Sequence, residues 1–119
     1  MGMSEVTVRL ANLTAPNRTE EVSLLVDTGA TLSWVPRPVL ESLNATVFSR
    51  LPFELAAGRQ LERDVTTLLL TIDGRKAPVA VAFGESGEAS VLGATALESL
   101  GLLVDPVAQK LIPRNLRML

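Results

Sequence analysis

The sequence predicts a mostly β protein built from many short strands. Segments rich in Val, Leu, Ile and Thr recur at close intervals along 119 residues, and Gly, Pro, Asn or Asp separates them. Only residues 38–44 and 95–100 have the apolar spacing of a short helix. No fixed-period repeat and no low-complexity linker divides the chain. We therefore expect a single barrel-like domain over residues 1–119, with one or two short helices.

The first half of the chain combines alternating and continuous apolar segments. Alternation of apolar and polar residues indicates a half-buried strand, whereas a continuous apolar run indicates a strand covered on both faces. Proline is tolerated at the first helical position, so Pro38 is a plausible helix start. The expected elements are a strand over 6–10, a loop over 12–20, a strand over 21–26, a strand over 32–35 that stops at Pro36, and a helix ending near Asn44.

The second half is dominated by hairpin signals, in which glycine or Asp-Pro stands between two apolar runs. A glycine after an apolar helical segment is typical of a helix end. The expected elements are an irregular segment over 47–51, a hairpin of 53–55 with 60–63 around residues 56–59, strands 65–72 and 77–83 joined by a turn at 73–75, a short strand over 90–92 broken at Gly93, a helix over 95–100 ending at Gly101, and a hairpin of 102–104 with 110–112.

Charge and hydropathy exclude some classes of partner. The net charge is −2, and the longest basic cluster is Arg75-Lys76. Nucleic acid binding requires a positive surface that displaces counterions, so we expect no nucleic acid partner. No apolar run approaches the ~18–20 residues that cross a bilayer. The first residues also lack the basic and apolar regions of a signal peptide. We expect a cytoplasmic protein that does not bind membranes.

The chain contains no His and no Cys. This composition excludes a thiol nucleophile, a disulfide, a histidine base, a serine triad and a conventional zinc site. Lys76 and Lys110 are the only lysines, and both lie in turn-like polar segments. Hydrolytic chemistry would therefore depend mainly on carboxylates, and we expect no metal and no cofactor.

The segment Leu24–Thr31 is the strongest candidate for such chemistry. Three aliphatic residues lead directly into Asp27, Thr28 and Gly29. A carboxylate at the end of a buried strand is costly unless it is hydrogen-bonded, paired or used. Gly29 permits backbone conformations closed to other residues and lets main-chain groups approach a ligand. The alternative is an ordinary Asp-Thr-Gly turn that closes a hairpin, with Asp27 capping its own loop.

Three segments in this order carry a family resemblance. They are Leu-Val-Asp-Thr-Gly-Ala at 25–30, the glycine-tipped hairpin Phe-Glu-Leu-Ala-Ala-Gly-Arg at 53–59, and Val-Leu-Gly at 91–93 opening a helix. Together they resemble the retropepsins, the single-domain aspartic proteases of retroviruses and their cellular relatives. Bacterial retropepsin-like proteins are more similar still, through residues 53–59, 91–102 and 104–106. The resemblance covers nearly the whole chain.

The resemblance implies a closed β domain, the single-lobe acid-protease barrel, that acts as a homodimer on a peptide or protein substrate. Each chain would contribute one Asp-Thr-Gly loop, and the sequence contains one such loop. Two adjacent carboxylates share a proton, so one can activate water while the other donates a hydrogen bond to the carbonyl oxygen. Such chemistry needs no metal and no covalent intermediate. Leu116–Leu119 is apolar for a free tail, and we expect it to pack across the subunit interface.

The resemblance also implies roles for individual residues. Asp27 would be the catalytic acid and base, with Thr28, Gly29 and Ala30 forming the active-site loop. The Thr28 hydroxyl would bond across the two-fold axis, and Gly29 would expose backbone groups to the substrate. The flap that closes over the substrate would comprise Ala56, Ala57, Gly58 and Arg59, and the residues supporting the active-site loop would be Val91, Leu92 and Gly93.

Some positions depart from the retroviral pattern. Retroviral members usually carry an acid soon after Asp-Thr-Gly-Ala and an arginine after the downstream glycine, but here these positions hold Thr31 and Ala94. Both partners of that ion pair are missing, so neither charge is left unpaired. Arg59 either selects acidic substrate side chains or is simply solvated. Trp34 is interpreted as a core or dimer anchor, with a substrate-contacting wall as the alternative.

The leading prediction is an aspartic endopeptidase whose dyad takes one Asp27 from each chain. A dimeric peptide-binding or scaffold module of the same fold, with little or no cleavage activity, is the alternative. A carboxylate metal site is a third hypothesis, and the small number of acids near Asp27 argues against it.

Overall fold

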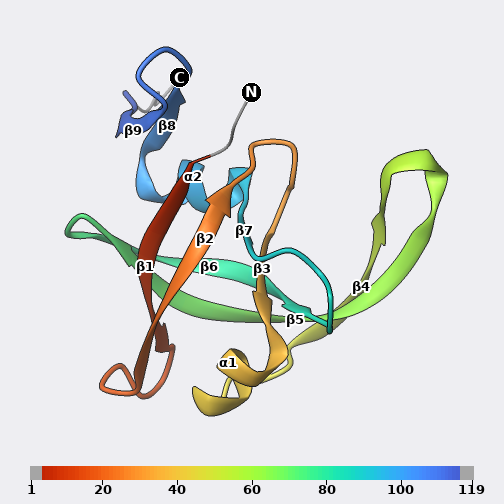
Figure 1. The fold of residues 1–119 in the computed structure, drawn as a ribbon. Coiled ribbons are helices and arrows are strands. Elements are labelled where there is room, and N and C mark those ends of the chain that lie inside the picture. The colour runs from red at the N-terminus through yellow and green to blue at the C-terminus, as the bar shows by residue number, and fades with distance from the viewer. Residues whose placement is uncertain (1–3, 116–119) are drawn as a thin grey trace.

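The computed structural model describes residues 4–115. Strands dominate this part of the chain, together with two short α-helices and one 3-10 turn (Figure 1). This confirms the expected mostly β class with two short helices. The elements are β1 (Glu5–Asn12), β2 (Thr19–Val26), β3 (Ser33–Pro36), α1 (Arg37–Ser42), β4 (Ser49–Glu54), η1 (Ala56–Gly58), β5 (Gln60–Ile72), β6 (Arg75–Gly84), β7 (Val91–Leu92), α2 (Ala94–Leu100), β8 (Leu102–Asp105) and β9 (Lys110–Pro113).

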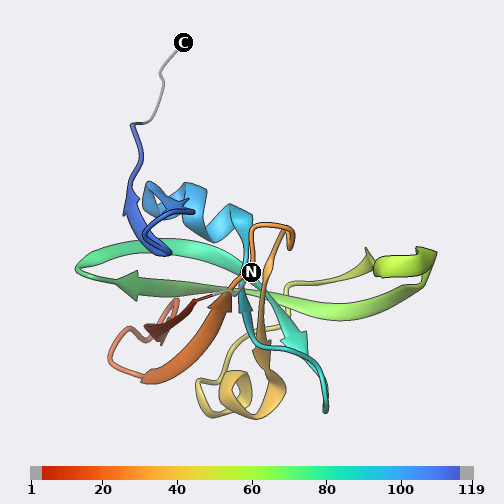
Figure 2. The same ribbon diagram turned by 45° about the horizontal axis from the view of Figure 1, so that its top comes forward.

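Seven strands form one sheet in the order β1-β2-β7-β3-β6-β5-β4, and β8 pairs with β9 in a separate hairpin. Most neighbours are antiparallel, but β2 runs parallel to β7 and β3 runs parallel to β6. β1 also pairs with β5 over residues 9–12 and 68–71, so the sheet curves back on itself. The two helices lie on opposite sides of the β5–β6 hairpin (Figure 2). The sheet therefore brings the short strand β7 between β2 and β3.

The hairpin of β4 and β5 projects away from the rest of the molecule (Figure 1). Residues 49–54 pair with residues 60–65 of β5, so the predicted irregular segment over 47–51 is wrong from Ser49 onward. β4 is mostly exposed, and its short alternation of Leu51 and Phe53 is interrupted by Pro52, so the sequence gives only a weak strand signal. Its conformation comes from backbone pairing with β5. Pro52 fits there because β4 is the last strand of the sheet, where a missing donor is tolerated.

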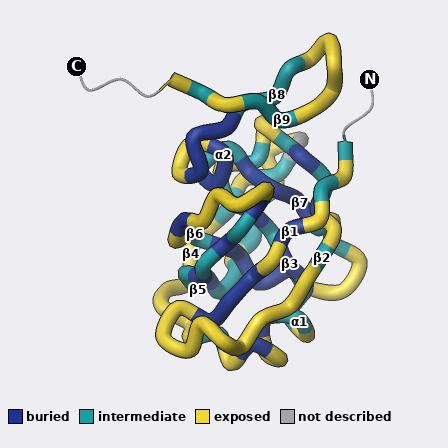
Figure 3. Tube along the Cα trace, turned by 90° about the vertical axis from the view of Figure 1, so that its left-hand side faces the viewer, coloured by how far each residue is buried: buried dark blue, intermediate teal, exposed yellow. Residues whose placement is uncertain are grey.

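The core is built from aliphatic side chains on the inner face of the curved sheet. Buried residues concentrate along the strands and α2, while the turns are exposed (Figure 3). Phe83 is the largest fully buried side chain. Helix α2 contributes Ala96, Leu97 and Leu100, and it ends at Gly101 in the left-handed conformation (φ 69°), as expected for a glycine cap. The fully buried leucines are Leu10, Leu24, Leu40, Leu43, Leu68, Leu70 and Leu92.

Two further expectations concern the ends of the chain and the membrane. Residues 116–119, which were expected to pack across a subunit interface, lie outside the described residues. Across residues 4–115, neither helix has the length and apolar character needed to span a bilayer.

The pairing of β1 with β5 gives a stability prediction. Leu10 lies opposite Leu70 in this pairing, and both side chains are fully buried. Leu10→Ala should lower the free energy of unfolding by ~2–5 kcal/mol, since the cavity left behind is only partly filled by relaxation. Urea denaturation followed by circular dichroism measures this change. Leu13→Ala is the matched control, because Leu13 is 37% exposed and its truncation should change the free energy by no more than ~0.5 kcal/mol.

Candidate functional site

Asp27 follows directly on β2, and its backbone is fixed by the neighbouring strand β7. The Asp27 N–H donates to the Leu92 carbonyl at 2.9 Å. Its own side-chain Oδ1 accepts the Gly29 N–H at 3.0 Å, so the carboxylate does cap its own loop. The loop does not close a hairpin, however, since β7 lies between β2 and β3. The second carboxylate oxygen leaves capacity for other contacts, and the side chain is only half-buried.

The loop after Asp27 is bonded to the start of α2. Ala30 and Thr31 offer their carbonyl groups to the backbone of α2, and the buried Ser33 hydroxyl accepts a backbone N–H from Gly93. The segment that includes Val91, Leu92 and Gly93 is therefore bonded to the Asp27 loop through Leu92 and to Ser33 through Gly93. The contacts are Ala94 N to Ala30 O at 2.8 Å, Thr95 N to Thr31 O at 3.1 Å, Thr95 Oγ1 to Thr31 O at 2.8 Å and Gly93 N to Ser33 Oγ at 3.0 Å.

Gly93 is the point of closest approach between the two segments. A Cβ at this position would lie 2.5 Å from the Leu32 carbonyl oxygen and 2.8 Å from the Ala30 carbonyl oxygen. Both atoms belong to the backbone, so neither can move as the end of a flexible side chain could. Only glycine allows the loop and β7 to pack at this distance.

Two hollows meet at Asp27. The first, which we call the flap groove, has a volume of about 960 Å³ and lies between the Asp27 loop and β4. The second, the terminal hollow, has a volume of about 980 Å³ and lies between the Asp27 loop, the start of β1, α2 and the β8–β9 hairpin. The flap groove is lined by Asp27, Gly29, Ala30, Thr31, Leu32, Trp34, Leu51, Pro52, Phe53, Glu54, Leu55, Glu88, Ala89 and Val91. Asp27 is thus open to a groove of a size that suits an extended ligand.

The β4–β5 hairpin, which we call the flap, has an unusual backbone at its tip. Ala57 and Gly58 have φ values of 68° and 75°, and the Leu55 N–H donates to the Arg59 carbonyl at 2.6 Å. A left-handed alanine is strained by ~1–2 kcal/mol, because its Cβ approaches the following carbonyl. Ala57, Gly58 and Arg59 are exposed and do not belong to the groove lining, which takes its flap residues from β4 and Leu55.

The structure adds an aromatic contact that the sequence did not reveal. Trp34 was expected in the core or at a dimer contact, with a substrate-contacting wall as the alternative, and it is half-buried and lines the flap groove. Its ring meets that of Phe53 edge-on, with the centroids 4.9 Å apart and the planes at 64°. In β3 the buried side chains are Ser33 and Val35, so alternation directs Trp34 to the other face. The sequence does not show which face of β3 is covered, so it could not assign Trp34 to the groove.

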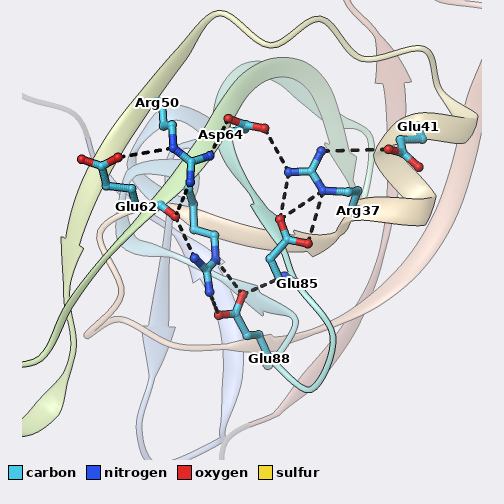
Figure 4. A network of polar contacts seen from close by, with 8 residues as sticks. Arg37, Glu41, Arg50, Glu62, Asp64, Glu85 and Glu88 are labelled. Atoms are coloured by element: carbon cyan, nitrogen blue, oxygen red, sulfur yellow. Dashed lines mark hydrogen bonds and ion pairs between the residues drawn. The ribbon is translucent and has the colours of Figure 1, made fainter.

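A network of ion pairs surrounds the base of the flap (Figure 4). Arg37 at the start of α1 donates to Asp64 on β5 at 3.0 Å and to Glu85 after β6 at 2.9 Å. Arg50 on β4 donates to the other Asp64 oxygen at 2.9 Å. These contacts join a helix, the two flap strands and the segment after β6. Asp64 is the centre of the network and its side chain is 22% exposed.

A second pair, Arg63 with Glu88, lies beside this network. The Arg63 guanidinium donates to both Glu88 oxygens, with Nε 3.1 Å from Oε1. The Arg63 hydrogen bonds hold the pKa of Glu88 below its ordinary value, and those of Arg37 and Arg50 do the same for the pKa of Asp64. Glu88 also accepts the Glu85 N–H at 2.7 Å, which closes the turn of residues 85–88. Both acids are thus held in the ionised form by arginine.

Comparison with family models and with curated proteins identifies no relative. The chain matches no family model, and it has no significant match among curated proteins. Within residues 4–115, no three or more His, Cys, Asp or Glu residues come together in a way that could hold a metal ion. The functional interpretation therefore depends on the geometry around Asp27.

The close approach at Gly93 gives a first prediction for the site. Gly93→Ala should lower the free energy of unfolding by ~1–3 kcal/mol or more, because the new methyl group overlaps the backbone of Leu32 and Ala30. Chemical denaturation monitored by Trp34 fluorescence measures the change. Ser99→Ala adds no such overlap on the exposed side of α2 and should leave stability nearly unchanged. Equal stability of the Gly93→Ala and native chains would contradict the assigned packing.

The arginine-bound acids give a prediction for pH. Because the folded pKa values of Asp64 and Glu88 lie below their ordinary values of 3.8 and 4.5, their contribution to stability is complete above those values. It is lost as the pH falls below them and through the folded values. The melting temperature of the native chain should therefore drop more between pH 6 and pH 3 than that of the Asp64→Asn/Glu88→Gln chain.

The control for this measurement is Glu21→Gln. Glu21 pairs with Arg9 on the surface, where the two side chains are 62% and 59% exposed and the ion pair contributes little. Glu21→Gln should keep the full pH dependence of the native chain. An equal pH dependence in the native and doubly substituted chains would contradict the role of the network.

Proposed function

We propose that this protein is an aspartic endopeptidase with the retropepsin-like fold, in which two copies each supply one Asp27 to a shared active site. The observation that carries this proposal is the position of Asp27 between two hollows. On one side lies the flap groove, with its apolar walls and overhanging hairpin. On the other side lies the terminal hollow, which Thr28 also lines. A second copy seated there would bring its own Asp27 loop to the same groove.

The number of suitable carboxylates in one chain supports the need for a second chain. Hydrolysis by paired acids requires one ionised and one protonated carboxyl group, and the chain has one Asp-Thr-Gly loop. Glu54 and Glu88 also line the flap groove, but Glu88 is bound to Arg63. Glu54 is exposed on β4 and takes no part in the hydrogen bonds that fix the Asp27 loop. The matching carboxylate therefore comes from another chain.

The proposed reaction proceeds without a covalent intermediate. The ionised Asp27 of one copy takes a proton from water as the water oxygen attacks the peptide carbonyl carbon. The protonated Asp27 of the other copy donates a hydrogen bond to the carbonyl oxygen as negative charge develops there. Collapse of the tetrahedral intermediate breaks the C–N bond, and the leaving nitrogen takes a proton from a carboxyl group. The Gly29 N–H, which donates to Asp27 Oδ1, keeps the carboxylate oriented.

The flap groove fits an extended peptide. β4 is the last strand of the sheet, and its residues 51–54 line the groove together with Leu55. An extended segment can pair with backbone groups there, while alternate side chains enter apolar subsites. Leu32, Trp34 and Phe53 supply the apolar surface of the groove. Thr31 and Ala94 are joined to the supporting structure by backbone bonds, so the retroviral ion pair at these positions is not needed for rigidity.

Cleavage of a mixed peptide library by the native chain and by Asp27→Asn tests the proposal. The native chain should cleave, and Asp27→Asn should lose at least about a thousandfold in kcat/KM, because an amide cannot act as the base or share the proton. Sedimentation and circular dichroism on both chains should show the same dimer and the same fold. Glu21→Gln, which changes an exposed acid outside the groove, is the matched control and should retain cleavage.

Several outcomes would overturn the proposal. Equal cleavage by the native and Asp27→Asn chains would place the chemistry elsewhere. Cleavage by a strict monomer would contradict a shared site. Peptide binding without turnover from acidic to neutral pH would favour the scaffold alternative.

A further inference from the structure

The segment between Glu88 and Leu92 holds both the flap and the Asp27 loop. Glu88 binds Arg63 on β5 through both carboxylate oxygens. Two residues later, the Ser90 carbonyl accepts the Leu25 N–H at 3.0 Å, and the Leu92 carbonyl accepts the Asp27 N–H at 2.9 Å. One short segment is therefore bonded to the flap at one end and to the Asp27 loop at the other.

The Arg63–Glu88 pair lies at the wall of the flap groove. Glu88 is itself part of the groove lining. Arg63 is paired in the β4–β5 register with Leu51, which lines the same groove from the flap side. The pair thus spans from the flap to the opposite wall. The Arg63 and Glu88 side chains are only 18% and 23% exposed, whereas those of the surface pair Arg9–Glu21 are 59% and 62% exposed.

The surrounding charged groups favour the pairing of Arg63 with Glu88. Glu85 and Arg37 also act electrostatically on Arg63, and they are bound to each other at 2.9 Å. The turn of residues 85–88 is held by the Glu88 N–H donating to the Glu85 carbonyl at 3.1 Å. Glu88 is therefore presented to Arg63 by a turn that α1 anchors through Arg37. An enclosed, two-pronged arginine–carboxylate contact is stronger and more directional than an exposed one.

We infer that Arg63 and Glu88 are positioning residues that tie the flap to the groove wall and so set the width of the groove above Asp27. The pair touches no reacting atom and acts through the flap. When the tie is broken, the β4–β5 hairpin swings away from the groove, and Phe53 on β4 leaves Trp34 on β3. The Trp34–Phe53 contact reports the closed position directly.

Trp34 makes this inference measurable without any substrate, because it is the only tryptophan and the chain has no tyrosine. Glu88→Gln keeps the shape of the side chain but removes its charge. Acrylamide quenching of Trp34 should roughly double in this variant, because opening the flap exposes the indole ring to solvent. High salt should raise the quenching of the native chain much less than this substitution does, because partly buried ion pairs are only weakly screened.

Cleavage gives the second readout, and this part rests on the proposed function. The Glu88→Gln chain should show kcat/KM lowered about tenfold, mainly through KM, because a displaced flap weakens binding while Asp27 stays in place. Arg63→Gln should behave in the same way. The exchanged pair Arg63→Glu/Glu88→Arg should restore part of both the quenching and the KM, since it places opposite charges at the same two positions.

The matched control is Arg9→Gln, which breaks the exposed Arg9–Glu21 pair and should alter neither readout. Native-like circular dichroism shows that each variant is folded. Arg63→Lys is a milder substitution that keeps the positive charge. Unchanged quenching in folded Glu88→Gln, or an equal rise in Arg9→Gln, would overturn the inference. Absence of cleavage by the native chain would overturn the proposed function instead, and quenching alone would then decide whether the tie exists.

Discussion

The structure depends on the contact between two backbone segments at Gly93. The Asp27 loop and the start of α2 approach so closely that a single methyl group does not fit between them. This approach places β7 between β2 and β3, although β7 is only two residues long. A strand of that length has little stability of its own. It is held because backbone groups on both sides find partners there, and because Leu92 is fully buried.

The same contact explains how a carboxylate can lie at the end of a buried strand. The Asp27 side chain is fixed by the Gly29 N–H, and the loop backbone is fixed by β7 and α2. The side chain itself remains half-buried and open to the groove. The contacts that hold the loop backbone therefore leave the Asp27 side chain accessible from the groove. At Thr31, the Thr95 hydroxyl and N–H both donate to the backbone carbonyl and so join the loop to α2.

Much of the fold could be predicted from the sequence, because burial and turn chemistry leave local signals. The Asp73–Gly74 turn, the Gly101 helix end and the hairpin around residues 56–59 were all visible in this way. β4 was partly missed, because its first residues are exposed and owe their conformation to β5. The order of strands in the sheet has no local signal either, since it is set by pairings distant in sequence. For that reason the separation of β2 from β3 by β7 emerged only from the structure.

The candidate site, like the fold, could be predicted only in part from the sequence. Asp27 and Gly93 could be found from the sequence, because each stands out against its apolar neighbours. Trp34 and Glu88 could not be assigned to the groove with the same ease. Their positions depend on which face of β3 is covered and on where the turn of residues 85–88 lies. The ion pairs around Asp64 join elements that are far apart along the chain, so no spacing in the sequence reveals them.

The outer edge of β4 has a consequence for the behaviour of the protein in concentrated solution. A projecting two-stranded ribbon with a free edge invites the same ribbon of another molecule to add to it, which is a common start of fibrous aggregation. Pro52 interrupts the row of donors on this strand, and Arg50 and Glu54 place charge on either side of it. These three residues protect the exposed ribbon from uncontrolled stacking.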